Sequence, residues 1–149
     1  MAKITVRPME EKDISQAAYI HRKVVREGLG QGMKYAIEDL FKSFIKKSPN
    51  TSLVAEKDNK VAGFIIGDIK EWGFGVERSG WIEMIEVDPK LMGEGIGKTL
   101  GEALIKYFKE QKIKEVYTTV RWDSGDLIAF FQSIGFDKSS FINLEFKSG

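Results

Sequence analysis

Three glycines at alternate positions, Gly93, Gly95 and Gly97, are the residues whose spacing points most clearly to chemistry. Glycine has no Cβ, so its backbone can adopt positive φ and a ligand can approach it closely. An apolar run ending at Val87 precedes them, Pro89 ends that run, and a helical apolar pattern follows. We therefore expect a strand, a glycine loop and a helix in succession. N–H groups at a helix N-terminus attract negative charge, so the predicted ligand is a phosphate or a pyrophosphate.

Two common phosphate-binding motifs do not fit this spacing. A P-loop that ends in Gly97-Lys98-Thr99 requires a glycine at position 92, which is Met92. A dinucleotide-binding fingerprint places two residues between its second and third glycines, whereas one residue separates Gly95 from Gly97. A nucleotide phosphotransferase would rest on the Gly-Lys-Thr tripeptide alone, and measurable binding of ATP would support it.

The segment Val-Asp-Pro-x-x-x-Gly-x-Gly-Ile-Gly, residues 87–97, is followed by a Leu-rich helical pattern. It resembles motif A of the GNAT superfamily of acetyl-CoA-dependent N-acetyltransferases. Residues 126–136 are similar to motif B of that superfamily, a short helix that ends in an aromatic pair and then Gly-Phe. The resemblance covers residues 80–146 through these motifs and residues 3–70 through the order of elements.

The resemblance implies that acetyl-CoA is a co-substrate, and no metal is expected. It implies that the pyrophosphate binds a loop that consists of Gly93, Glu94, Gly95, Ile96, Gly97 and Lys98. The main chain of Ile85, Glu86 and Val87 would pair with pantetheine, with the Val87 N–H stabilising the tetrahedral intermediate. Family members usually carry Gln or Arg at the position of Met92, which here supplies no charge.

Two further positions relate to the cofactor arm and the leaving group. Ser124 stands where the family often has an Asn that bonds pantetheine, and it could instead cap the following helix. Phe131 stands where most relatives have a Tyr that protonates the departing thiolate, and Phe cannot donate a proton. A thiolate with a pKa near ~8.5 can leave largely unaided, and Tyr35, Tyr117 and Ser124 are alternative acids.

Glu83 and Glu86 lie on the strand before the loop, and simple alternation places them on opposite faces. The resemblance places proton-relaying carboxylates on this strand, so Glu83 is the preferred general base, taking a proton from the incoming ammonium through water. The alternative is that Glu83 merely faces solvent. His21 lies on the apolar stripe of the first predicted helix, which indicates a packed, hydrogen-bonded histidine rather than an acid or base.

Composition limits the function classes. The 149 residues suit one domain, residues 1–149. A net charge of +1 gives no electrostatic footprint for nucleic acid or an anionic membrane. The absence of cysteine excludes thiolate chemistry, and a single histidine argues against a zinc site. No apolar stretch approaches the ~18 residues of a membrane-spanning helix. We therefore expect a cytoplasmic protein, with a homodimer as one option.

Hydrophobic periodicity predicts a succession of strands and helices, an α/β fold. The resemblance implies a mixed, mostly antiparallel GNAT-type sheet with helices on both faces. The expected strands are 3–7, 52–56, 61–69, 81–87, 116–120 and 141–146. One helix is expected to begin at a cap on Asp13, a second to cover 37–45, a third to follow the glycine loop and a fourth to begin near residue 126. Residues 71–79 are expected to form a glycine- and aromatic-rich connection.

The predicted function is an N-acetyltransferase that moves an acetyl group from acetyl-CoA to a primary amine by direct attack in a ternary complex. The alternative is an acyl-CoA-binding module with weak or no catalysis, which Phe131 and Met92 would favour. The acceptor is expected to be a small-molecule or peptide amine.

Overall fold

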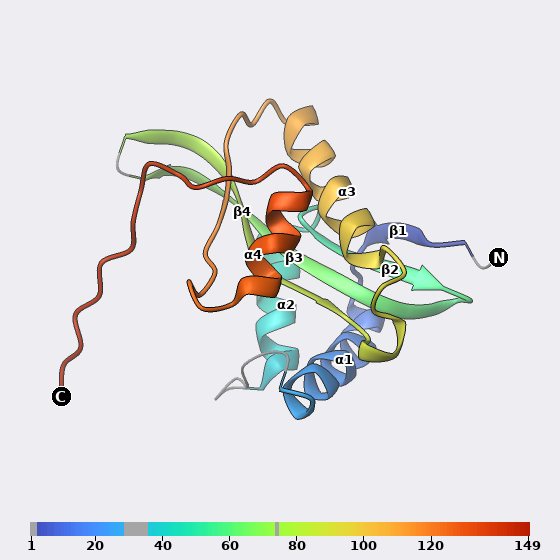
Figure 1. Ribbon diagram of the computed structural model, residues 1–149. Coiled ribbons are helices and arrows are strands. Elements are labelled where there is room, and N and C mark those ends of the chain that lie inside the picture. The colour runs from blue at the N-terminus through green and yellow to red at the C-terminus, as the bar shows by residue number, and fades with distance from the viewer. Residues whose placement is uncertain (1–2, 29–35, 74) are drawn as a thin grey trace. The chain divides into compact units, whose positions relative to one another are not determined.

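The computed structural model describes residues 3–28, 36–73 and 75–149. The contacts between residues divide the chain into two compact units, Met1–Thr119 and Val120–Gly149. The first unit contains the whole sheet and three of the helices, and the second contains one helix and the C-terminal segment (Figure 1).

The first unit is built on a five-stranded sheet whose spatial order follows the chain order. All neighbouring strands are antiparallel except the last pair, which is parallel. The predicted mixed, mostly antiparallel sheet is therefore confirmed. Its strands are β1 (Thr5–Pro8), β2 (Ser52–Lys57), β3 (Lys60–Gly73), β4 (Val76–Val87) and β5 (Val116–Thr118).

Helices cover both faces of this sheet, as predicted. Phe64 and Ile66 of β3 belong to one core cluster with the apolar residues of α1 (Ile14–Arg26) and α2 (Ile37–Lys47). On the opposite face, the open side of Gly63 faces Ile96 of α3 (Ile96–Glu110). Two short 3₁₀ turns precede α1 and follow β4, at Glu11–Asp13 and Pro89–Leu91.

The helix α3 lies very close to the sheet at Gly80. A Cβ at this position would lie 2.8 Å from ring carbons of Phe108, which is fully buried. Side-chain atoms do not tolerate such a separation, so the absence of a side chain at Gly80 sets the depth at which α3 packs.

The hairpins extend further than the sequence indicated. Asp58 and Asn59 form the turn between β2 and β3 in left-handed conformations, as their position predicted. The expected connection at 71–79 is instead largely strand, because Lys70 pairs with Ser79 and Trp72 with Glu77. That expectation was wrong because cross-strand pairing overrode the glycine-rich composition.

A bulge in β4 changes which side chains share a face. Ile66 pairs with Met84 and Gly67 with Ile82, which leaves Glu83 as an extra residue in the ladder. The expectation that Glu83 and Glu86 point to opposite faces assumed unbroken alternation, and the extra residue breaks it.

The cap expected for α1 also differs. Asp13 occupies the N-cap position but makes no side-chain cap bond to α1. Its buried carboxylate instead accepts hydrogen bonds from both terminal nitrogens of Arg7, at 2.7 and 2.8 Å. Burial disfavours this charge, but the bonds from Arg7 and from the Glu10 N–H outweigh it, so the pKa of Asp13 lies below its usual value.

The second unit contains α4 (Gly125–Ser133), and Gly135 after it has the positive φ predicted for a helix stop. The rings of Phe130 and Phe136 both lie 5.2 Å from that of Phe131. The strand predicted at 141–146 was wrong: this segment has no regular structure, and Ile142 and Phe146 are exposed. Alternation of apolar residues permits a strand, but a strand forms only with a partner edge.

None of the helices in the described ranges is long and apolar enough to cross a bilayer.

Candidate functional site

The glycine loop forms the strand-to-helix corner that the spacing predicted. The Asp88 carboxylate accepts the Lys90 N–H at 3.1 Å and so begins the turn after β4. Gly93 and Gly95 then adopt φ values of 88° and 82°, in the left-handed region that favours glycine, and Gly95 is the N-cap of α3. A Cβ at either glycine would meet no atom within 4 Å, so the face of the loop is open.

The N–H groups of this loop are available for a ligand. The first backbone bond of α3 runs from the Thr99 N–H to the Gly95 carbonyl at 3.0 Å. Within the described parts of the chain, the N–H groups of residues 93–98 make no hydrogen bond. Free N–H groups at a helix N-terminus with open space before them fit an anion such as a diphosphate.

The C-terminal half of β4 offers an open edge beside this loop. In the part of the chain that the structure describes, the ladder between β4 and β5 spans only Gly80–Ile82. The β4 residues beyond Ile82 pair on one side only, with β3. Unpaired strand edges bind extended groups through the main chain.

The direction of each main-chain group along this edge follows from one hydrogen bond. The Asp88 N–H donates to the Ala62 carbonyl of β3 at 2.8 Å. Because main-chain groups alternate along a strand, Ile85 and Val87 present their N–H and C=O groups to the open edge. Of the three residues predicted to pair with pantetheine, Ile85 and Val87 thus present their main-chain groups to the open edge, whereas Glu86 directs its own toward β3.

Glu83 lies exposed at the bulge, near a buried carboxylate. Asp68 of β3 is 3% exposed and accepts a hydrogen bond from Lys47 Nζ of α2 at 2.8 Å. The pKa of Lys47 is raised by this bond to Asp68 and also by the charge of Glu83. The candidate base therefore lies within electrostatic reach of the end of α2.

Glu86 and His21 form a buried pair between β4 and α1. His21 Nδ1 lies 2.8 Å from Glu86 Oε1, and the side chains are 6% and 11% exposed. Burial raises the pKa of Glu86, and the hydrogen bond with His21 opposes that rise. The packed, hydrogen-bonded histidine expected from the sequence is present, although its Nε2 has no partner among the described residues.

A second pair fastens α1 to the end of β4. Lys23 Nζ donates to Asp88 Oδ1 at 2.6 Å. Burial disfavours the Asp88 charge, but hydrogen bonds from Lys23 and Lys90 outweigh it, so the pKa of Asp88 lies below its usual value. Sequence motifs identified Asp88 but gave no sign of Lys23, because this contact joins residues far apart in the chain.

The predicted residues of the second unit are placed within that unit only. Ser124 is at the N-cap position of α4, but its side chain makes no cap hydrogen bond. Phe131 is buried in its aromatic cluster. The roles of both residues toward acetyl-CoA stay predictions.

Of the two tyrosines considered as alternative acids, the structure describes Tyr117 but not Tyr35. The Tyr117 hydroxyl donates to Glu115, and this bond raises the pKa of Tyr117 to about 12. Such a hydroxyl is a weaker acid than a free tyrosine. Tyr35 lies outside the described residues.

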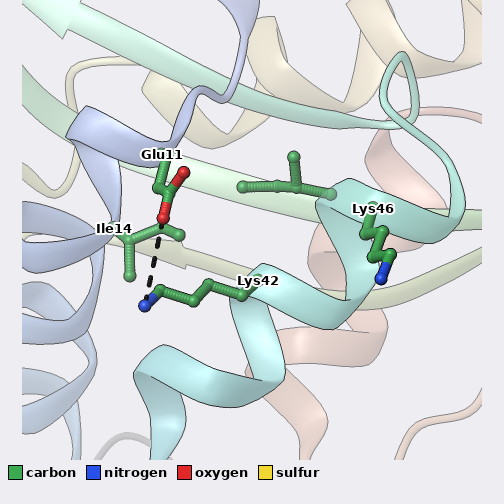
Figure 2. A pocket seen from close by; sticks show the side chains of 5 residues that line it. Glu11, Ile14, Lys42 and Lys46 are labelled. Atoms are coloured by element: carbon green, nitrogen blue, oxygen red, sulfur yellow. Dashed lines mark ion pairs between the residues drawn. The ribbon is translucent and has the colours of Figure 1, made fainter.

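A shallow pocket of about 320 Å³ opens between the start of α1 and α2. Figure 2 shows the ion pair between Lys42 and Glu11 at this pocket. It is lined by Glu11, Ile14, Lys42, Ile45 and Lys46. Ile14 precedes His21 by seven residues, roughly 10 Å along a helix, so the pocket is removed from the end of α1 that contacts β4.

Comparison with solved structures shows the same fold in proteins of known structure. An aminoglycoside N-acetyltransferase, AAC(6')-Iy, in complex with CoA superposes with a TM-score of 0.79 at 14% identity, over 99% of this chain and 96% of that one. A ribosomal-protein-alanine N-acetyltransferase from Brucella melitensis biovar Abortus 2308 gives 0.77 at 15% identity, over 99% and 100%.

Sequence comparison agrees. A mycothiol acetyltransferase of Amycolatopsis mediterranei (strain U-32) is 28% identical over 88 residues, which are 57% of this chain and 29% of that protein. The chain thus spans under a third of the length of this curated relative. The model of the acetyltransferase (GNAT) family matches residues 15–136, most of the chain and both of its units. The chain therefore belongs to the GNAT family of acetyltransferases.

Proposed function

We propose that this protein transfers an acetyl group from acetyl-CoA to a primary amine by direct attack in a ternary complex. One observation carries the proposal: free N–H groups at the start of α3 adjoin an open strand edge at the end of β4. The loop can bind the diphosphate of acetyl-CoA, and the neighbouring strand edge can form main-chain hydrogen bonds with the amides of its pantetheine arm. Family membership supports the same chemistry.

Each step is assigned to residues of this chain. The N–H groups of residues 93–98 bind the diphosphate, and Ile85 and Val87 pair with the pantetheine arm. Pairing along this edge holds the thioester against the C-terminal half of β4. The Val87 N–H, directed to the open edge, stabilises the oxyanion that forms on attack.

Glu83 is the proposed base. An amine near pKa ~10 is protonated at neutral pH and must lose that proton before it attacks. Glu83 is exposed and makes no ion pair in the described parts of the chain, so its carboxylate is available to water or an ammonium. Asp68, in contrast, is already bound by Lys47.

The acceptor is proposed as a small-molecule or peptide amine. The named relatives differ widely, from an aminoglycoside N-acetyltransferase to a ribosomal-protein-alanine N-acetyltransferase. We also propose one acetyltransferase domain over residues 1–149 and a cytoplasmic location, and a homodimer stays a prediction.

Gly95→Asp tests the anion site directly. The substitution places a side chain at positive φ and a negative charge where the diphosphate should bind. We expect acetyl-CoA affinity, measured by calorimetry, to fall at least tenfold in a variant that keeps the native circular dichroism spectrum. Unchanged affinity in the folded variant would falsify the placement.

The alternative is an acyl-CoA-binding module with weak or no catalysis, which Phe131 and the uncharged Met92 favour. The wild-type protein should release free thiol from acetyl-CoA when presented with a panel of primary amines. Tight acetyl-CoA binding without thiol release from any amine would favour the module.

A further inference from the structure

Glu94 is a negatively charged residue within the loop that is proposed to bind a diphosphate. It stands between Gly93 and Gly95, so it puts a carboxylate next to N–H groups that attract anions. Like charges at such short range repel, and an unpaired carboxylate here would weaken binding of any phosphate. Met92, the residue before Gly93, is exposed and carries no charge, and Lys98 follows Gly97 in the first turn of α3.

The structure pairs Glu94 with a lysine from another part of the chain. Lys57 Nζ donates to Glu94 Oε1 at 2.6 Å. The Lys57 side chain is 23% exposed, less than the 41% of Glu94, so much of the lysine is held against the protein. The bond to Glu94 raises the pKa of Lys57, which keeps the ammonium charged.

The position of Lys57 follows from packing that is independent of the ion pair. Lys57 is the last residue of β2, at the turn into β3. The base of this hairpin is attached to the loop region, because the Ala62 carbonyl accepts the Asp88 N–H and Gly63 lies against Ile96 of α3. The hairpin therefore holds a lysine within one side-chain length of the loop.

We propose that Lys57 is a phosphate-binding residue of the acetyl-CoA site and that Glu94 positions it. The inference rests on the proposed function. Lys57 supplies the positive charge that Met92 does not, and Glu94 orients the ammonium toward the loop and is itself neutralised. When CoA binds, the ammonium contacts a phosphate oxygen, either of the diphosphate or of the 3′-phosphate. Its three N–H donors allow it to bond this oxygen and Glu94 at the same time.

Measurements in a Glu94→Gln background separate phosphate binding by Lys57 from simple neutralisation of Glu94. Glu94→Gln removes both the repulsive carboxylate and the charged partner that positions Lys57, so this variant is the reference in which Lys57 has no ion pair. In that background, Lys57→Met keeps the aliphatic stem but removes the charge. We expect the double variant to bind CoA about tenfold more weakly than Glu94→Gln alone.

Lys57 would be shown to do no more than neutralise Glu94 if the double variant and Glu94→Gln bound CoA equally well. Lys60→Met is the matched control, since Lys60 is exposed on the same hairpin and has no ion pair in the described ranges. Its CoA affinity should equal that of the wild type. An equal loss in this control would mean a general charge effect and would overturn the assignment.

The ligands distinguish the two phosphate sources. A loss that persists with dephospho-CoA assigns Lys57 to the diphosphate, and one that vanishes assigns it to the 3′-phosphate. The difference between variants should shrink at high salt, because ions screen exposed charges. Suppose that Gly95→Asp loses CoA binding while the double variant binds CoA as tightly as Glu94→Gln. The proposed CoA site would then stand, and only the role of Lys57 would be rejected.

Discussion

At the scale of single residues, several charged side chains form ion pairs between elements, and only some of these pairs add stability. The carboxylates of Asp13 and Asp88 have lowered pKa values, because basic partners outweigh burial. Glu86 differs, since burial raises its pKa despite His21. The ionised form of Glu86 is therefore a cost to the folded state.

Glu86→Gln should remove that cost while keeping a hydrogen bond to His21. With its folded pKa above its unfolded value, Glu86 contributes stability that is present at low pH. This stability is lost as pH rises through the folded pKa. We expect the difference in unfolding free energy, variant minus wild type, to increase as pH rises from about 4.5, measured by urea denaturation at several pH values.

Asp13 and Asp88 titrate in both proteins, so their opposite contributions cancel in this difference. If the plots of unfolding free energy against pH for the wild type and Glu86→Gln stay parallel, Glu86 has no raised pKa in the folded protein.

At the scale of elements, the site depends on how closely α3 lies against the sheet. The helix N-terminus carries the anion site, and the same helix packs its buried Phe108 against Gly80 of β4. Any change that moves α3 outward would also move the glycine loop away from the open edge of β4.

Gly80→Ala should destabilise the fold, because its Cβ would overlap the Phe108 ring. We expect a loss of about 1–3 kcal/mol, the usual cost of overpacking a core, seen as a lower urea midpoint. Gly73→Ala is the matched control on the same hairpin, since a Cβ there meets nothing within 4 Å. Its stability should stay within about 0.5 kcal/mol of the wild type. Equal midpoints for the two variants would contradict this account of α3 packing.

At the scale of the whole molecule, the main question is how the residues of the second unit take part in catalysis. Family resemblance places Phe131 near the CoA sulfur, where a tyrosine usually serves as an acid. Phe131 lies in the unit 120–149, whereas the glycine loop and β4 lie in the unit 1–119. A leaving-group role for residue 131 is thus a prediction about the assembled enzyme.

Phe131→Tyr tests this prediction at almost constant volume. A hydroxyl beside the departing thiolate should raise the transfer rate where thiolate departure is limiting, by up to about 10²-fold. It should leave the rate level where amine attack is limiting. The decisive measurement is a crystal structure with CoA, in which the ring edge should lie beside the sulfur. A ring far from the sulfur would remove the prediction, and whichever hydroxyl lies there would become the acid to mutate.

Much of the fold could be predicted from the sequence because its signals are local. Apolar periodicity predicted α1, α2 and α3, and Asp58-Asn59 predicted the turn between β2 and β3. The glycine spacing and Pro89 predicted the corner after β4, because positive φ and the missing proline N–H act within a few residues. These local preferences predicted the shape of the loop, and the resemblance to two family motifs suggested the family.

Tertiary structure decided what depends on distant partners. The bulge at Glu83 arises only when β4 is matched against β3, so the unbroken alternation assumed from the sequence does not hold there. Residues 141–146 have the apolar alternation of a strand but form none, because a strand also requires a partner strand to pair with. Lys57 carries no motif and meets Glu94 only because a hairpin brings it to the loop. Pairing between distant segments reflects the packing of the whole chain, which no local pattern contains.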